Sequence, residues 1–230
     1  MPADLDTIAD PVFILLAWAA GLALTAGVIS WARVVGPGFT WLAGGTAGLI
    51  GLAGVFGEEA WWARAALLSL AIGLILGRNR RLAGMALTAS GVLYLIEAAL
   101  LGGWAPALTA TLALGGVTGE MMLGHWYLID PRLPRWALRA LAVAGIAGLT
   151  ADGLVLALLG DLPGGGGTVA FWVLLGTSIL LMAGVIGSLR YPAYSGVMAA
   201  TGLSYLAVLT TLGAVFLGRA LVAGLGPFAN

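Results

Sequence analysis

The stretch DPVFILLAWAAGLALTAGVISWAR, residues 10–33, decides the fold of this chain. Between Asp10 and Arg33 it has no charged side chain, and about 20 consecutive apolar residues are enough for a helix to cross the hydrocarbon core of a bilayer. Asp10 is a suitable N-cap, and Pro11 is a suitable first residue of a helix. The stretch therefore predicts a transmembrane helix over residues 11–32.

The rest of the chain has the same character. Of its 230 residues, 61% are hydrophobic and 9% are charged, and the mean hydropathy is +1.05, whereas about a quarter of the residues of a soluble domain are charged. Proline, glycine and charged residues divide the remaining sequence into further apolar stretches. We expect an all-α polytopic membrane protein with short loops and eight transmembrane helices, at residues 11–32, 39–56, 60–77, 82–102, 106–129, 134–160, 168–189 and 196–222.

The residue types that are missing exclude several kinds of chemistry. The chain has no lysine, no cysteine and one histidine. It therefore cannot provide a Schiff-base lysine, a disulfide framework, a cysteine-ligated zinc or iron–sulfur site, or two histidines for a haem. The short loops leave no room for a soluble catalytic domain, so we do not expect the chain to be catalytic on its own.

The loop charges predict the orientation in the membrane, because short cytoplasmic loops collect arginine and lysine. One predicted side carries eight arginines, namely Arg33, Arg78, Arg80, Arg81, Arg132, Arg135, Arg139 and Arg190. The opposite side carries six acids and no loop arginine, namely Asp4, Asp6, Asp10, Glu58, Glu59 and Asp161. We expect a multi-pass protein of a bacterial-type inner membrane, with both termini on the non-cytoplasmic side.

A weak internal similarity suggests that the chain is built from two related halves. Residues 89–95, ASGVLYL, match residues 200–206, ATGLSYL, at an offset of 111, and the first halves align more weakly at an offset of 95. Four helices are an even number, so both units would run in the same direction. We expect a parallel 4+4 repeat, with residues 1–103 as the first four-helix unit and residues 104–230 as the second. In architecture, though in no aligned residue, this arrangement resembles the quinone-interacting membrane subunits of polysulfide-reductase type.

Five ionisable residues lie within predicted helices, where charges are costly and so are candidates for function. They are Arg64, Glu97, Glu120, Asp152 and Arg219, an excess of one negative charge. From the helical rise of 1.5 Å per residue, Arg64, Glu97 and Asp152 lie at one level. Together they could form a proton relay in which Arg64 neutralises one carboxylate and the other carries a proton. The alternative is a structural pair of Arg64 with Glu97. We expect Arg219 to be an anchor at the membrane interface.

A second candidate site lies in GEMMLGHWY, residues 119–127. Glu120, His125, Trp126 and Tyr127 could bind the headgroup of a quinone or another lipid-soluble ligand, since histidine and tyrosine donate to a carbonyl and a carboxylate moves the proton. However, a spacing of five turns Glu120 and His125 about 140° apart on the helix. A structural histidine is the first alternative. A Cu(I) site with the neighbouring methionines is disfavoured, and we expect no other metal.

These observations leave three functional hypotheses open. The favoured one is an integral membrane subunit of a respiratory or similar redox complex, which binds a quinone or lipid-like ligand and relays protons through buried acids. The second is a small proton-coupled transporter or permease. The third is a scaffold subunit whose acids are merely paired. We expect the lipid bilayer and other membrane or peripheral subunits as partners, and no nucleic acid.

Overall fold

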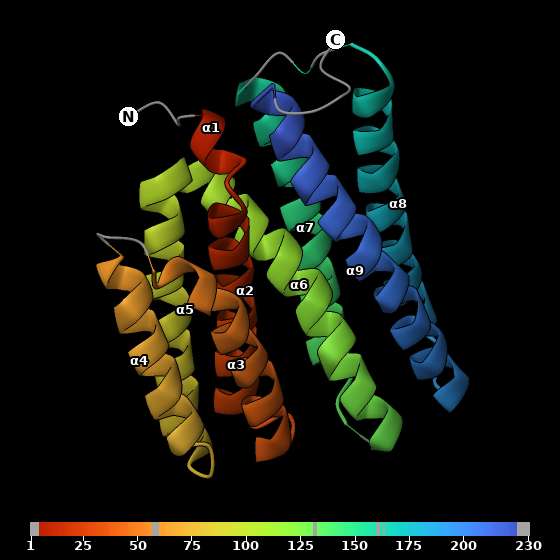
Figure 1. The fold of residues 1–230 in the computed structure, drawn as a ribbon. Helices are drawn as coiled ribbons and strands as arrows, with labels where there is room; N and C mark the ends of the chain where they lie inside the picture. Colours follow the sequence, from red (N-terminus) through yellow and green to blue (C-terminus); the bar gives the residue numbers. More distant parts are fainter. Residues whose placement is uncertain (1–4, 57–59, 131–132, 160–161, 163, 225–230) are drawn as a thin grey trace.

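The computed structural model describes residues 5–56, 60–130, 133–159, 162 and 164–224, and every regular element among them is helical (Figure 1). After a single turn, α1 (Leu5–Ile8), eight longer helices follow. They are α2 (Pro11–Trp31), α3 (Pro37–Gly51, continued by the 3₁₀ turn η1, Leu52–Gly54), α4 (Trp61–Ile75), α5 (Arg80–Gly102), α6 (Trp104–Ile129), α7 (Trp136–Leu159), α8 (Gly166–Ser188) and α9 (Tyr194–Val222).

The all-helical fold with eight helices is confirmed, and each helix overlaps its predicted range. Local signals explain several helix ends. The Asp10 side chain accepts the N–H of Val12 at 2.7 Å, and Pro11 is the first residue of α2, as predicted. The Asn79 side chain accepts the N–H of Leu82 at 3.4 Å, so α5 begins at Arg80, two residues before the predicted start.

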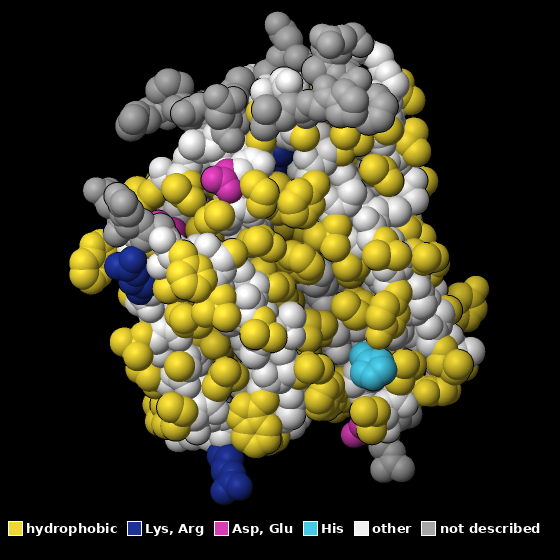
Figure 2. Space-filling view, in the orientation of Figure 1, with side chains coloured by type: hydrophobic (Ala, Val, Ile, Leu, Met, Phe, Trp, Pro, Cys, Tyr) yellow, Lys and Arg dark blue, Asp and Glu magenta, His cyan; other side chains and the backbone are white. Residues whose placement is uncertain are grey.

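Five of the helices, α2, α5, α7, α8 and α9, are long and apolar enough to cross a membrane. Figure 2 shows hydrophobic side chains over most of the visible flank, and several large ones are well exposed, for example Ile75 (83%), Leu158 (86%) and Leu180 (74%). Because water does not favour such a surface, this exposure is typical of helices that face lipid. A membrane protein is therefore supported by composition, helix length and surface.

The helices alternate in direction, so that α2 begins and α9 ends at the upper end of Figure 1. The opposite end, where α2, α4, α6 and α8 finish, is called the arginine end below. Its described arginines are Arg33, Arg78, Arg80, Arg81, Arg135, Arg139 and Arg190. Arg132 and the predicted outer acids Asp4, Glu58, Glu59 and Asp161 lie outside the described residues, as does the side chain of Asp6.

The eight helices pack as two groups, α2–α5 and α6–α9. Corresponding helices of the two groups contact one another in the same pairs. In the first group α2 packs on α3 and α5, and α4 on α5; in the second, α6 packs on α7 and α9, and α8 on α9. The groups meet mainly where α2 crosses α6. There a Cβ on Gly21 would lie 2.6 Å from the Cα of Gly115, so only glycine allows this backbone contact.

The residues matched by the internal similarity have different surroundings. Tyr94 is fully buried, whereas its counterpart Tyr205 is 47% exposed. A Cβ on Gly91 would collide with α2, whereas nothing lies within 4 Å of the same position on Gly202. The two halves therefore share the pattern of helix–helix contacts, but matched residues are packed differently.

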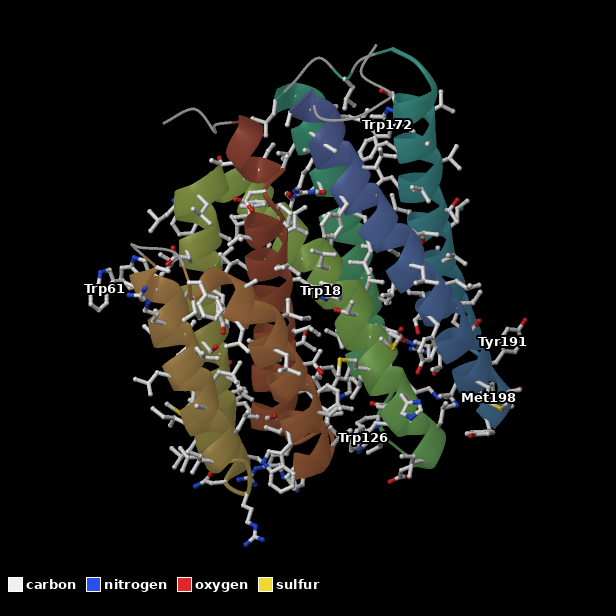
Figure 3. All side chains as sticks on the ribbon, in the orientation of Figure 1. Trp18, Trp61, Trp126, Trp172, Tyr191 and Met198 are labelled. Atoms are coloured by element: carbon white, nitrogen blue, oxygen red, sulfur yellow. The ribbon has the colours of Figure 1, made fainter. Side chains whose placement is uncertain are left out.

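The helices α3 and α4 are shorter than predicted. Each has 15 residues, which is about 22 Å of helix against the roughly 30 Å of a hydrocarbon core. In Figure 1 they form a hairpin that starts from the arginine end and stops below the upper end of α5, and Figure 3 places Trp61, the first residue of α4, well below Trp172. Eight full-length spans are therefore not confirmed.

Candidate functional site

The second helix group contains a buried ion pair between α7 and α9. The guanidinium of Arg219 donates from Nη1 to Oδ2 of Asp152 at 2.9 Å and from Nη2 to Oδ1 at 2.8 Å. Arg219 is 0% exposed and Asp152 is 2% exposed. Such a two-point pair holds both charges in a fixed geometry, which offsets part of the cost of removing them from water.

Two further helices complete this cluster. From α6, the Thr109 hydroxyl donates to Oδ1 of Asp152 at 2.6 Å, and the carbonyl of Pro106 accepts from Nη2 of Arg219 at 3.3 Å. From α2, the Phe13 ring faces the guanidinium at 5.6 Å. The expectation that Arg219 anchors at the membrane interface is wrong, because Asp152 draws its side chain into the protein. The cluster joins α2, α6, α7 and α9.

The predicted relay of Arg64, Glu97 and Asp152 is not brought together as one cluster. Glu97 lies on α5, 7% exposed, and its Oε2 accepts the N–H of Ala63 at 3.1 Å, so the carboxylate caps the N-terminus of α4. Arg64, one residue further on, donates to the carbonyl of Val55 and closes the α3–α4 hairpin. Arg64 and Glu97 thus share one end of a hairpin, while Asp152 has Arg219 as its partner.

Among the described acids, Glu120 is fully buried and has no hydrogen-bond partner for its carboxyl group. It is 0% exposed on α6, and neither carboxyl oxygen has a hydrogen-bond partner within the described residues. Ser204 of α9 lies near the carboxyl, but its hydroxyl donates to the carbonyl of Thr201 at 2.8 Å. A Cβ on Gly124 would lie 2.9 Å from the Thr201 hydroxyl and 3.7 Å from a Glu120 oxygen, so the carboxyl points toward α9.

The other three residues of the predicted ligand site point in different directions from α6. His125 is exposed, as the cyan side chain in Figure 2 shows. Trp126 packs edge-on against Phe39 of α3, with ring centroids 6.0 Å apart, and Figure 3 shows it toward the arginine end. Tyr127 is buried and donates to the carbonyl of Pro134 at 2.6 Å, which fixes the α6–α7 turn. Glu120 and these three residues do not surround a common space.

An apolar cleft between the two helix groups was missed by sequence reasoning. It lies between α2 and α7, has a volume of 260 Å³, and is lined among others by Leu24, Val28, Trp136 and Ala144. A second cavity of 80 Å³ shares part of this lining and reaches α6, where the buried Thr111 hydroxyl has no partner within the described residues. Gly115 and Gly116 of α6 have no side chains that would fill this cavity.

One sequence signal could have identified the ion pair. Among the arginines of residues 104–230, Arg219 alone lies away from the arginine end, on the same side of the helix centres as Asp152. Comparison with known protein families, curated proteins and solved structures finds no match to this chain. The candidate site therefore depends on the geometry alone.

Proposed function

We propose that the chain is an integral membrane subunit that takes up and releases a proton at Glu120, inside its second helix group. The observation that supports this most directly is the buried carboxyl group between α6 and α9, which has no cation partner and accepts no hydrogen bond from the described residues, although the Ser204 hydroxyl lies near it. Glu120 thus replaces the predicted trio of Arg64, Glu97 and Asp152 as the centre of proton exchange.

The physical argument concerns the cost of burying a charge. An ionised carboxylate with no partner in an apolar interior is strongly disfavoured, whereas the neutral acid is tolerated. By the helical rise, Glu120 lies about 24 Å from the start of α6 and about 14 Å from its end. A proton bound at that depth must arrive through the protein. Transient rotation of the Ser204 hydroxyl would offer the ionised form a donor, since a hydroxyl is free to rotate.

Carbodiimide labelling tests this proposal. Dicyclohexylcarbodiimide dissolves in apolar regions and adds to protonated carboxyl groups. We expect the purified protein to be modified at Glu120, with a yield that falls as the pH rises, and Glu120→Gln to abolish the modification. Asp152 is the matched control, because it is as buried but bound to Arg219. Modification of Asp152 in preference to Glu120 would contradict the proposal.

The membrane arrangement proposed with this function keeps all eight helices in the bilayer. The helices α3 and α4 enter from the cytoplasmic face as a short hairpin, and both termini lie outside, in keeping with the arginine end. Because the chain has no cysteine, single cysteines at Asp10 and Arg78 can be labelled with an impermeant maleimide in intact cells. We expect labelling of the cysteine at position 10 alone. Labelling of the cysteine at position 78 alone would show that the orientation is the opposite of the proposed one.

The parallel 4+4 repeat also belongs to this proposal. The shared order of helix contacts supports it, although the packing of matched residues differs. If the halves are units in their own right, residues 1–103 and 104–230 expressed as two chains should assemble and co-purify. Failure of the two chains to associate, while each inserts into the membrane, would count against it.

A second candidate function, binding of a quinone or another lipid-soluble ligand, is favoured by the cleft between α2 and α7. Its apolar lining suits an isoprenoid or acyl chain, and Thr25 and Thr111 could bind a polar group at its floor. A photoreactive quinone analogue should label this cleft in the native membrane, and Ala144→Trp should reduce the labelling. Val143→Trp is the matched control, because Val143 is exposed on the same helix.

Assembly with other subunits can be tested in the same preparation. A subunit of a redox complex should co-purify with its partners from native membranes in mild detergent. A chain that purifies alone, carries no quinone and is not labelled in the cleft would contradict this second candidate and leave proton exchange at Glu120 untouched.

A further inference from the structure

The arginine end carries a basic recess between the end of α2 and the start of α5. It has a volume of 530 Å³ and is lined by Arg33, Arg78, Asn79 and Arg80. Figure 2 shows basic, dark blue atoms projecting from this end of the molecule. Arg33 and Arg78 are exposed, and neither has an acidic partner within the described residues. The recess therefore presents positive charge that no described acid neutralises.

The backbone around the recess is held in place. Nη1 of Arg80 donates to the carbonyl of Val35 at 3.0 Å and to that of Arg33 at 3.4 Å, which ties α5 to the turn after α2. Arg33 itself has a φ of 56°, in the left-handed region where a helix C-terminus commonly turns. Nη2 of Arg80 makes no hydrogen bond to a described residue, and the N-terminus of α5 adds partial positive charge.

An apolar cleft of 420 Å³ begins one helical turn deeper between the same two helices. It is lined by Val28 and Trp31 of α2 and by Gly84, Met85 and Thr88 of α5. Gly84 follows Arg80 by four residues, so both cavities lie along one face of α5. Arg33 lies in the turn just after Trp31, the last residue of α2. A Cβ on Gly84 would lie 2.8 Å from the Cβ of Trp31, so a larger residue at this position would not fit beside α2.

We propose that this basic recess and the neighbouring apolar cleft together bind one anionic phospholipid. Its phosphate lies among Arg33, Arg78 and Arg80, and an acyl chain lies in the cleft beside Trp31 and Met85. Arginine binds phosphate through a planar set of donors, and basic pockets between helices on the cytoplasmic side suit anionic headgroups. Trp31, which is 60% exposed, stands at the level where headgroup and chain meet.

Native mass spectrometry of the full chain in mild detergent tests the proposal with three probes: phosphatidylglycerol, phosphatidylcholine and inorganic phosphate. We expect phosphatidylglycerol to bind more tightly than phosphatidylcholine. We expect Arg78→Gln to weaken phosphatidylglycerol binding about fivefold, and Arg190→Gln, which removes one charge at the same end but outside the recess, to change it little.

A second variant tests the acyl chain separately. Met85→Trp narrows the cleft without altering any arginine, and we expect it to weaken phosphatidylglycerol binding as well. If inorganic phosphate competes fully and Met85→Trp has no effect, the recess is a phosphate site and the lipid proposal fails. If Arg190→Gln weakens binding as much as Arg78→Gln, the attraction is general to the arginine end and the proposal also fails.

Discussion

Two regions of the second helix group contain a buried acid, and they differ in what surrounds it. Asp152 is held by both terminal nitrogens of Arg219 and by the Thr109 hydroxyl. Glu120, about 16 Å further along α6 from Thr109 by the helical rise, has none of these partners. Burial is complete in both regions, so burial by itself does not separate a structural acid from a functional one.

The difference lies in the charge that each region can tolerate. Around Asp152 the negative charge is matched by Arg219, so the acid serves to join helices. Around Glu120 the ionised form is unmatched, so a proton must accompany the carboxyl group whenever no other cation is present.

The largest effect is expected from Arg219→Met, which leaves Asp152 buried without its partner. Removing one member of a buried pair costs about 3–5 kcal/mol of the free energy of unfolding. Unfolding of the purified protein in mixed detergent micelles measures this loss. The control is the double variant Asp152→Leu with Arg219→Met, which we expect to recover most of the stability because an apolar pair replaces both charges. If the double variant is as unstable as Arg219→Met, the ion pair is not the reason for the loss.

A smaller effect is expected from Thr109→Val, which removes the hydroxyl that donates to Asp152. Side-chain hydrogen bonds within membranes are worth about 0.6 kcal/mol on average, and those to charged groups are worth more, so we expect a loss of about 1 kcal/mol. Thr201→Val, beside Glu120, is the matched control. The Thr201 hydroxyl donates to the carbonyl of Val197 in its own helix, so its removal should change stability less. Equal losses would show that the two regions are not energetically different.

The sequence predicts some of these features and not others, for a physical reason. Apolar length and breaks are local properties, so the eight helices and the Asp10 N-cap of α2 follow from the chain alone. The depth of a residue is also local, and it places Asp152 and Arg64 at one level. However, depth is one coordinate, and the direction of a side chain around its helix depends on which helices pack together. For that reason the sequence predicts an interfacial Arg219, whereas the structure buries it against Asp152.

The ligand site on α6 illustrates the same limit. The spacing of Glu120 and His125 predicts side chains about 140° apart, and the structure places one against α9 and the other on the surface. That part of the geometry could be predicted. The lack of a hydrogen bond to Glu120 among the described residues could not, because it depends on Thr201 and Ser204 of α9, more than 80 positions later in the chain.

A third prediction concerns Glu120→Gln, for which we expect a stability change under about 1 kcal/mol. The amide has nearly the shape of the neutral acid, and no hydrogen bond from a described residue is lost. The matched change Asp152→Asn should cost several-fold more, because it leaves Arg219 with no countercharge. Equilibrium unfolding of both variants in the same micelles gives the comparison. A large loss with Glu120→Gln would show that the carboxyl has a structural partner.

The smallest effect is expected from His125→Ala. His125 is exposed on α6, and substitutions of exposed residues away from such clusters change stability by about 0.5 kcal/mol or less. It also shares no hydrogen bond with Glu120, so carbodiimide labelling of Glu120 should keep its pH dependence. This variant therefore tests whether His125 takes part in proton exchange at Glu120. If the labelling shifts when His125 is removed, the two residues act together as the sequence suggested; if it does not, proton exchange belongs to the α6–α9 contact alone.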